Sequence, residues 1–193
     1  GSMSCGDGMR ALLLAGGRSS RMGRDKALVE VEGEACIARI VKALAEAGRE
    51  PIRIAVAEPD DIELYGAVID SYIQVEWVLD AEPHSGPIEA MIEAFEDPLV
   101  DEETVQLAPV DVPWVNSALF VGLEEALGPS DCLSMPSDGL WAHPLLALVR
   151  PEAVVGRLKA GDRRPLHVQF AEMEHSVMLE EPSMLRNLNT PED

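Results

Sequence analysis

Short apolar runs alternate along the chain with longer segments in which apolar residues recur every three or four positions. The apolar run at 9–15 has the length of a buried strand, whereas Ile37, Ile40, Val41 and Leu44 share one face of a helix. The pattern predicts strands at 9–15, 52–57, 74–79, 104–108, 131–136, 142–149 and 166–171, a further apolar stretch at 175–179, and helices at 35–48, 60–69, 87–96, 114–127 and 151–159. This alternation is typical of an α/β fold with βαβ units around a mostly parallel sheet.

Three chemically informative features follow predicted strands of this sheet. A Gly16-Gly17 pair comes after the first strand, Asp80 after the third and Asp111 after the fourth. Ligands of open α/β sheets bind beyond the carboxyl ends of the strands, at a point where the strand order reverses. We therefore expect these residues to meet in one crevice.

Length and composition indicate one domain. We expect a single domain over 9–193, preceded by a tag or disordered N-terminus at 1–8, with the native start at Met3 or Met9. The sequence has no run of about 18 apolar residues and no signal-peptide pattern, so we expect neither a membrane span nor secretion. Its three cysteines are widely spaced and form no metal-binding pair, which favours a reducing, cytoplasmic location.

The charge distribution is uneven. The chain carries 15 Lys and Arg against 35 Asp and Glu, a net charge of −20, which argues against nucleic acid binding. Four of these cations, Arg18, Arg21, Arg24 and Lys26, nevertheless lie within nine residues after the glycine pair. Such a loop suits a polyphosphate. The few lysines resemble the surfaces of proteins from salt-loving organisms, although a high-GC genome would also favour Arg.

The loop sequence is specific. It is neither a Walker A sequence nor a G-x-G-x-x-G fingerprint. L-A-G-G-R-S-S-R-M-G-R-D-K at 14–26 closely resembles the signature loop of nucleotidyltransferases with a three-layer, Rossmann-like fold. Further segments resemble the molybdenum cofactor guanylyltransferase family within that superfamily: G-P-I-E-A at 86–90, A-P-V-D-V-P-W at 108–114, D-G-L-W-A-H-P-L-L-A-L at 138–148, G-D-R-R at 161–164 and N-L-N-T-P-E-D at 187–193.

The resemblance implies an enzyme and a reaction. Members of this family transfer GMP from GTP to the terminal phosphate of molybdopterin and release pyrophosphate. The resemblance therefore implies GTP and molybdopterin as substrates and Mg²⁺ as cofactor. It also implies transient contacts with proteins that make or accept the molybdenum cofactor.

The residues of the loop fit that chemistry. Backbone N–H groups of residues 15–19 could hold the β- and γ-phosphates. Arg21 would neutralise the leaving pyrophosphate, and the compact ammonium of Lys26 suits the α-phosphate. The expected nucleotide-binding residues are Leu14, Ala15, Gly16, Gly17, Arg18, Ser19, Lys26, Asp80 and Gly86. Arg18 and Arg24 fit ordinary solvated cations equally well.

Two aspartates are candidates for distinct roles. Asp111 lies in an apolar stretch, where a carboxylate needs a partner, and we expect it to bind Mg²⁺ and act in catalysis; alternatively, it caps the helix at 114–127. Asp80 could accept hydrogen bonds from the N1 and N2 donors of guanine, or merely cap a loop. The family often carries Asn after the second strand, where this chain has Ala57-Glu58-Pro59.

The resemblance places three further residues on the pterin side of the site: His143, Asn187 and Asn189. His143 could instead order a turn, and the asparagines could anchor the tail.

Alternatives to guanylyl transfer remain open. A sibling enzyme would transfer CMP to molybdopterin, or a nucleotide to a sugar or cobamide phosphate. Gly17 favours guanylyl transfer, because the cytidylyl relatives tend to read A-A-G. A non-catalytic nucleotide carrier is the other alternative, against which Lys26 and Asp111 argue.

Overall fold

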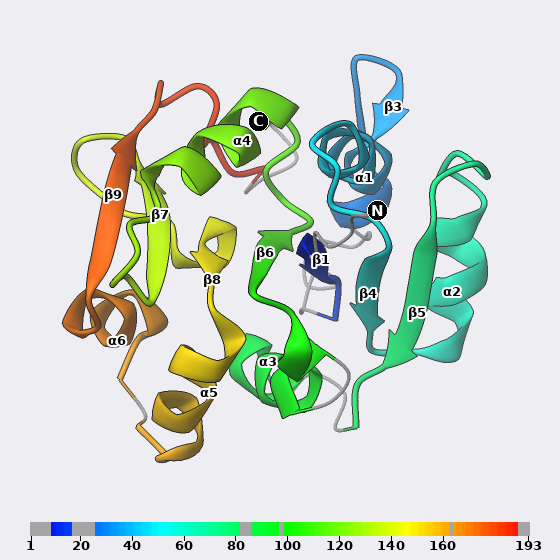
Figure 1. Cartoon of the computed structure of the whole chain (residues 1–193). Coiled ribbons are helices and arrows are strands. Elements are labelled where there is room, and N and C mark those ends of the chain that lie inside the picture. The colour runs from blue at the N-terminus through cyan, green and yellow to red at the C-terminus, as the bar shows by residue number, and fades with distance from the viewer. Residues whose placement is uncertain (1–8, 17–25, 82–85, 97–98, 163, 189–193) are drawn as a thin grey trace, which may run out of the picture.

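The computed structural model describes residues 9–16, 26–81, 86–96, 99–162 and 164–188. Its centre is a seven-stranded sheet with the order β5-β4-β1-β6-β8-β7-β9. Figure 1 shows these strands side by side across the molecule. The strands are β1 (Met9–Leu14), β4 (Ile52–Val56), β5 (Val75–Leu79), β6 (Thr104–Pro109), β7 (Leu133–Ser137), β8 (Leu148–Val149) and β9 (His175–Leu179).

The direction of the strands defines where a ligand can bind. β8 runs antiparallel to its neighbours β6 and β7, and the remaining pairs of the sheet are parallel. From β1 the chain builds outward through β4 to β5 and then returns to pair β6 with the other side of β1. The strand order therefore reverses between β1 and β6, which is the expected place for a ligand crevice.

Helices cover both faces of the sheet, so the predicted three-layer, mostly parallel α/β architecture is confirmed. Leu12 and Leu13 on β1 are both fully buried and belong to opposite hydrophobic clusters. Parallel strands covered on both faces read as such continuous apolar runs. The helices on one face are α1 (Cys36–Glu46), α2 (Pro59–Gly66) and α4 (Ser117–Ala126), and those on the other are α3 (Pro87–Glu96), α5 (Pro151–Lys159) and α6 (Leu166–Glu172).

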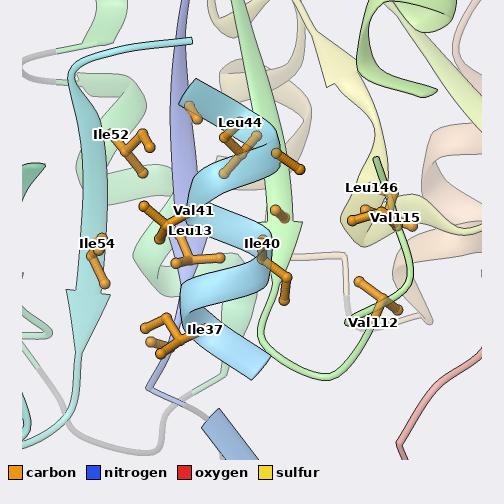
Figure 2. Packing of buried hydrophobic residues seen from close by; sticks show 14 of the residues in the cluster. Leu13, Ile37, Ile40, Val41, Leu44, Ile52, Ile54, Val112, Val115 and Leu146 are labelled. Carbon is orange, nitrogen blue, oxygen red and sulfur yellow. The ribbon is translucent and has the colours of Figure 1, made fainter. Parts of the chain in front are cut away.

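The core beneath α1 supports the carboxyl end of β6. Figure 2 shows Ile37, Ile40, Val41 and Leu44 of α1 packed over β1 and β4, with Val112 and Val115 nearby. These two valines lie on either side of the turn after β6 and are almost fully buried. They fix the segment that carries Asp111 to the rigid core.

The prediction of a strand at 166–171 is wrong, because this segment is helix α6. The apolar side chains alternate, but the buried positions are Gln169, Phe170 and Met173, together with the partly buried Leu166. These four follow a helical spacing of three and four residues. Gln169 is a core residue because its Nε2 donates to the carbonyl oxygens of residues 162 and 164, so counting it as a polar position gave a false strand period.

Other segments also differ from the prediction. The segment 142–149 contains a 3₁₀ helix, η5 (Pro144–Leu146), before the two-residue strand β8, because proline at 144 interrupts extended pairing. An unpredicted hairpin joins β2 (Glu30–Val31) and β3 (Glu34–Ala35). Its turn is formed by Glu32 and Gly33, both with positive φ, as tight hairpin turns require.

Within the described residues, no helix combines the length and the apolar composition needed to cross a membrane. The expected tag or disordered segment at 1–8 lies outside the described residues.

Candidate active site

A cavity of about 360 Å³ opens at the carboxyl ends of β1, β5 and β6, at the reversal of strand order. Nine of the residues singled out in the sequence line it: Leu14, Ala15, Gly16, Lys26, Asp80, Gly86, Asp111, His143 and Asn187. The structure therefore brings segments from five separate parts of the chain into one site. Gly17, Arg18, Ser19, Arg21 and Asn189 lie outside the described residues, and their roles stay predictions.

The end of β1 forms one wall of the cavity. The Ala15 N–H donates to the Ala55 carbonyl at 2.8 Å, so it extends the parallel ladder between β1 and β4. This N–H is therefore engaged within the sheet, while Ala15 lines the cavity and its contact with a nucleotide stays a prediction. Gly16 follows with the carboxylate of Asp80 packed directly against its Cα. This close approach brings the ends of β1 and β5 together.

Asp80 is held at the start of the loop after β5. Its backbone N–H donates to the Val56 carbonyl at 2.8 Å, which continues the ladder between β4 and β5 by one residue. Its side chain lies beside Gly16. Ala57, at the position where the family often carries Asn, is not among the residues that line the cavity.

Lys26 and Asp111 face the same cavity from different segments. Lys26 begins a 3₁₀ helix, η3 (Lys26–Leu28), that leads into the β2–β3 hairpin. Burial raises the pKa of Asp111 above its usual value, and the opposite charge of Lys26 and, more weakly, His143 acts against that rise. An ammonium and a carboxylate thus interact across a poorly solvated space, which suits the binding of a charged ligand between them.

The turn that carries Asp111 is tied to the chain's tail. The Leu188 N–H donates to the Asp111 carbonyl oxygen at 2.8 Å. Asn187, the preceding residue, places its Nδ2 at 3.5 Å from Oδ2 of Asp111. Asp111 and Asn187, which are 76 positions apart, therefore belong to the same constellation.

Asp111 does not cap the helix that follows. The N-cap of α4 is Asn116, whose Oδ1 accepts a hydrogen bond from the Leu119 N–H at 3.0 Å. The alternative role considered for Asp111 is thus filled by another residue, and its carboxylate remains directed at the cavity.

Arg39 is a structural residue of this site that the sequence analysis did not identify. From α1, its Nε donates to the Pro113 carbonyl at 2.9 Å and its Nη1 to the Val31 carbonyl at 3.3 Å. It thereby links the hairpin that follows Lys26 to the turn that follows Asp111. On a helical projection Arg39 lies on the face opposite Ile37, Ile40, Val41 and Leu44, so the sequence offered no signal that set it apart from a solvated cation.

His143 lines the opposite side of the cavity and ends a small turn. Its backbone N–H donates to the Pro136 carbonyl at 2.9 Å, and its Nε2 lies 3.7 Å from Oδ2 of Asp138. The other oxygen of Asp138 accepts the N–H groups of Leu140 and Trp141, and these bonds lower the pKa of Asp138. The histidine therefore both orders a turn, as one alternative held, and lines the cavity.

The residues present fit a divalent cation that is shared with a nucleotide. Among the described residues there is no group of three His, Cys, Asp or Glu side chains that could hold a metal ion alone. Mg²⁺ commonly takes one or two carboxylates and completes its coordination with phosphate oxygens and water. Asp111, partly buried and facing the cavity, could supply one such oxygen ligand.

Nine uncharged residues of the wall were not predicted: Ala55, Pro87, Ala90, Pro109, Val110, Val112, Pro144, Leu145 and Leu146. Eight of them lie within the motif segments 86–90, 108–114 and 138–148, and all nine shape the cavity through packing.

The chain matches the family model described as "MobA-like NTP transferase domain" over residues 11–174. It belongs to this family. It is accordingly a nucleotidyltransferase, and the predicted family resemblance is confirmed.

Relatives and structures agree with this assignment. The chain is 29% identical over 192 residues to the molybdenum cofactor guanylyltransferase of Shewanella frigidimarina, covering 94% of this chain and 91% of the relative. The fold is similar to molybdopterin-guanine dinucleotide biosynthesis protein A from Archaeoglobus fulgidus, with a TM-score of 0.68, 19% identity, and coverage of 95% and 94%. It is also similar to a Mycobacterium tuberculosis protein solved in complex with manganese, with a TM-score of 0.69, 15% identity, and coverage of 95% and 94%.

Proposed function

We propose that this nucleotidyltransferase transfers GMP from GTP to the terminal phosphate of molybdopterin and releases pyrophosphate. The observation that carries the proposal is that Lys26, Asp111 and Asp80 line one cavity at the reversal of strand order. The relative from Shewanella is named for this activity, which supports the same substrates here.

The reaction exchanges one phosphoanhydride bond for another. An oxygen of the acceptor's terminal phosphate forms a bond to the α-phosphorus of GTP, and the bond from that phosphorus to the β-bridging oxygen breaks. The electron pair leaves with pyrophosphate. A phosphate monoester has its second pKa near 6, so the nucleophile is already ionised at neutral pH and needs no general base. Catalysis then depends on positioning and on stabilising negative charge.

Lys26 and Asp111 would stabilise the negative charge of the phosphates in different ways. The Lys26 ammonium would contact the α-phosphate, where negative charge increases as the acceptor approaches. Asp111 would hold Mg²⁺, which supplies charge neutralisation to the phosphates when bound. The solved manganese complex of a structural neighbour is consistent with a divalent ion in this fold.

Asp80 would select the base. A carboxylate accepts two hydrogen bonds from the N1–H and N2–H groups of guanine, a donor pair that cytosine and adenine do not present. Gly16 allows the carboxylate to lie close to the end of β1, and Gly86 lines the same cavity. His143 and Asn187, on the other side of Asp111, would face the acceptor.

The first test is equilibrium binding of GTP, CTP and ATP with Mg²⁺, at low and at molar KCl. We expect preference for GTP, and loss of that preference in Asp80→Asn, which keeps the size of the side chain while replacing one acceptor oxygen by a donor. Preference for CTP in the unmodified protein would instead favour a cytidylyl sibling.

The second test is turnover with molybdopterin as acceptor. Lys26→Ala and Asp111→Asn should each lower kcat by about 10²-fold or more, the size of losing one electrostatic contact to the transition state. Lys159→Ala is the matched control, because its ammonium pairs with Glu96 at 2.5 Å, on the helices that cover the other face. Normal turnover in Lys26→Ala would contradict the assigned role.

A further inference from the structure

A cation–π contact joins the tail to the turn that carries Asp111. Cζ of Arg186 lies 5.1 Å from the centre of the Trp114 ring. Trp114 is three residues beyond Asp111, and Arg186 immediately precedes Asn187. Each partner of the contact is thus a short distance along the chain from a side chain that lines the cavity.

The tail segment, defined here as residues 184–188, is held to the rest of the molecule by three kinds of contact. Leu185 and Leu188 bury their side chains, with exposed fractions of 2% and 6%. The Leu188 N–H bonds to the Asp111 carbonyl. The Arg186–Trp114 contact supplies the third, on the exposed side of the segment.

These contacts attach the chain on both sides of Asn187. The two leucines dock the segment against the core on either side of Asn187. The contact of Arg186 with the Trp114 ring adds an attachment at the residue that immediately precedes Asn187, on the turn that carries Asp111. The Nδ2 of Asn187 lies 3.5 Å from Oδ2 of Asp111.

We propose that Arg186 and Trp114 are positioning residues of this active site, which hold the tail segment so that Asn187 meets Asp111. That this site is catalytic rests on the proposed function, whereas the contact between Arg186 and Trp114 is observed in the structure. Arg186 and Trp114 act through Asn187 and do not touch the reacting atoms.

Amide hydrogen exchange at Leu188 tests the contact without any measurement of activity. Four variants form matched pairs: Arg186→Lys and Trp114→Phe keep a cation and a ring, whereas Arg186→Gln and Trp114→Leu do not. We expect Leu188 to exchange about two- to fivefold faster in Arg186→Gln and Trp114→Leu, the size of an exposed cation–π contact. Arg186→Lys and Trp114→Phe should stay near the unmodified protein. Unchanged exchange in Arg186→Gln would overturn the proposal.

Kinetics then test whether the contact acts through Asn187. We expect Arg186→Gln to lower kcat for GMP transfer about two- to fivefold, with little change in the KM for GTP. In an Asn187→Ala background, the same substitution should have no further effect. An equal further loss in that background would show that Arg186 acts elsewhere and would overturn the proposal.

The two proposals fail in different ways. If the unmodified protein transfers no GMP, the proposed function fails, while Leu188 exchange still decides whether the contact holds the tail segment. If GMP transfer is normal and neither exchange nor kcat responds to Arg186→Gln, the positioning role fails and the proposed function stands.

Discussion

The carboxylate of Asp80 occupies the space in which any side chain at position 16 would lie. A Cβ built on Gly16 would be 2.1 Å from Oδ2 of Asp80 and 3.6 Å from the backbone nitrogen of Ala57. Asp80 is held in place by the bond from its N–H to the Val56 carbonyl. The glycine is therefore required by close packing between the ends of β1 and β5.

This relationship predicts that Gly16→Ala displaces the Asp80 carboxylate and weakens GTP binding. Loss of a hydrogen-bonding pair to a charged group costs about 1.5–3 kcal/mol, which corresponds to a Kd for GTP raised by about tenfold or more. Isothermal titration with GTP, CTP and ATP measures the change. Gly66→Ala is the control, because its added Cβ would meet its nearest atom, in Trp77, at an ordinary 3.7 Å. Unaltered GTP affinity in Gly16→Ala would contradict the role of Asp80.

A second prediction concerns Arg39, which joins the hairpin after Lys26 to the turn after Asp111. Arg39→Gln removes the donors to the Pro113 and Val31 carbonyls. We expect a loss of about 1.5 kcal/mol in the free energy of unfolding, and a reduced kcat, because two segments of the site lose their common support. Urea unfolding and steady-state kinetics measure these effects.

Lys42→Gln is the matched control for Arg39. Lys42 lies on the same helix and pairs with Glu34 at 2.6 Å, but its side chain is 40% exposed. Exposed ion pairs contribute little to stability. An equal loss of kcat in Lys42→Gln would show that the effect of Arg39 is a general property of α1.

The position of the site could be predicted from the sequence because its key residues directly follow apolar strands. Gly16, Asp80 and Asp111 each come at or just beyond the end of a short apolar run, and parallel strands bring such ends together. Lys26 and His143 were found through their motifs and line the same cavity. Local sequence was sufficient to predict the position of those site residues that the strand order alone brings together.

The features of the fold and site that were not predicted depend on contacts between residues far apart in the sequence, which no local sequence pattern indicates. The donors of Arg39 reach carbonyl groups, which every residue possesses, so nothing at positions 31 or 113 indicates the pairing. Gln169 is buried because two backbone carbonyls receive its amide. The sequence indicated Asp80 as the residue that recognises the base, but nothing in it indicated that the Asp80 carboxylate packs against Gly16.

A cluster of opposite charges between α5 and α6 predicts a specific response to acid. Hydrogen bonds from Arg164 and Arg157 lower the pKa of Glu172 to about 2, and Arg164 lowers that of Asp162 to about 2. Both pKa values lie below those of the unfolded chain. The cluster therefore stabilises the fold above about pH 4.5, and this contribution is lost as the pH falls toward 2.

Glu172→Gln should consequently have a lower Tm than the unmodified protein at pH 6, and the difference should shrink between pH 4.5 and 2. Thermal unfolding followed by circular dichroism across this range measures it. Glu152→Gln, on the first turn of α5, reports the effect of removing one exposed carboxylate. A difference in Tm that is constant with pH would exclude the Glu172 titration as its cause.

The buried thiol of Cys36 gives a prediction at alkaline pH. Burial raises the pKa of Cys36 to about 11 from the ordinary value of 9.0. The folded state thus favours the neutral thiol, so its contribution to stability is present below pH 9 and is lost as the pH rises to 11. At pH 8 we expect Cys36 to resist iodoacetamide, while the partly buried Cys132 reacts faster. Peptide mass mapping measures both, and rapid labelling of Cys36 in the folded protein would contradict its burial.

The excess of carboxylates predicts that salt stabilises the fold. With a net charge of −20 on 193 residues, repulsion between like charges opposes the compact state, and salt shortens the range of this repulsion. The Tm should therefore rise between about 10 mM and molar KCl, with most of the rise at low concentration if screening is the cause. Thermal unfolding in KCl and in NaCl measures the effect. Sucrose at matched osmolality is the control, because it is excluded from the protein surface but does not screen charge. A Tm that does not change with KCl would show that the carboxylates are too far apart, or too well paired with the 15 cations, to destabilise the protein.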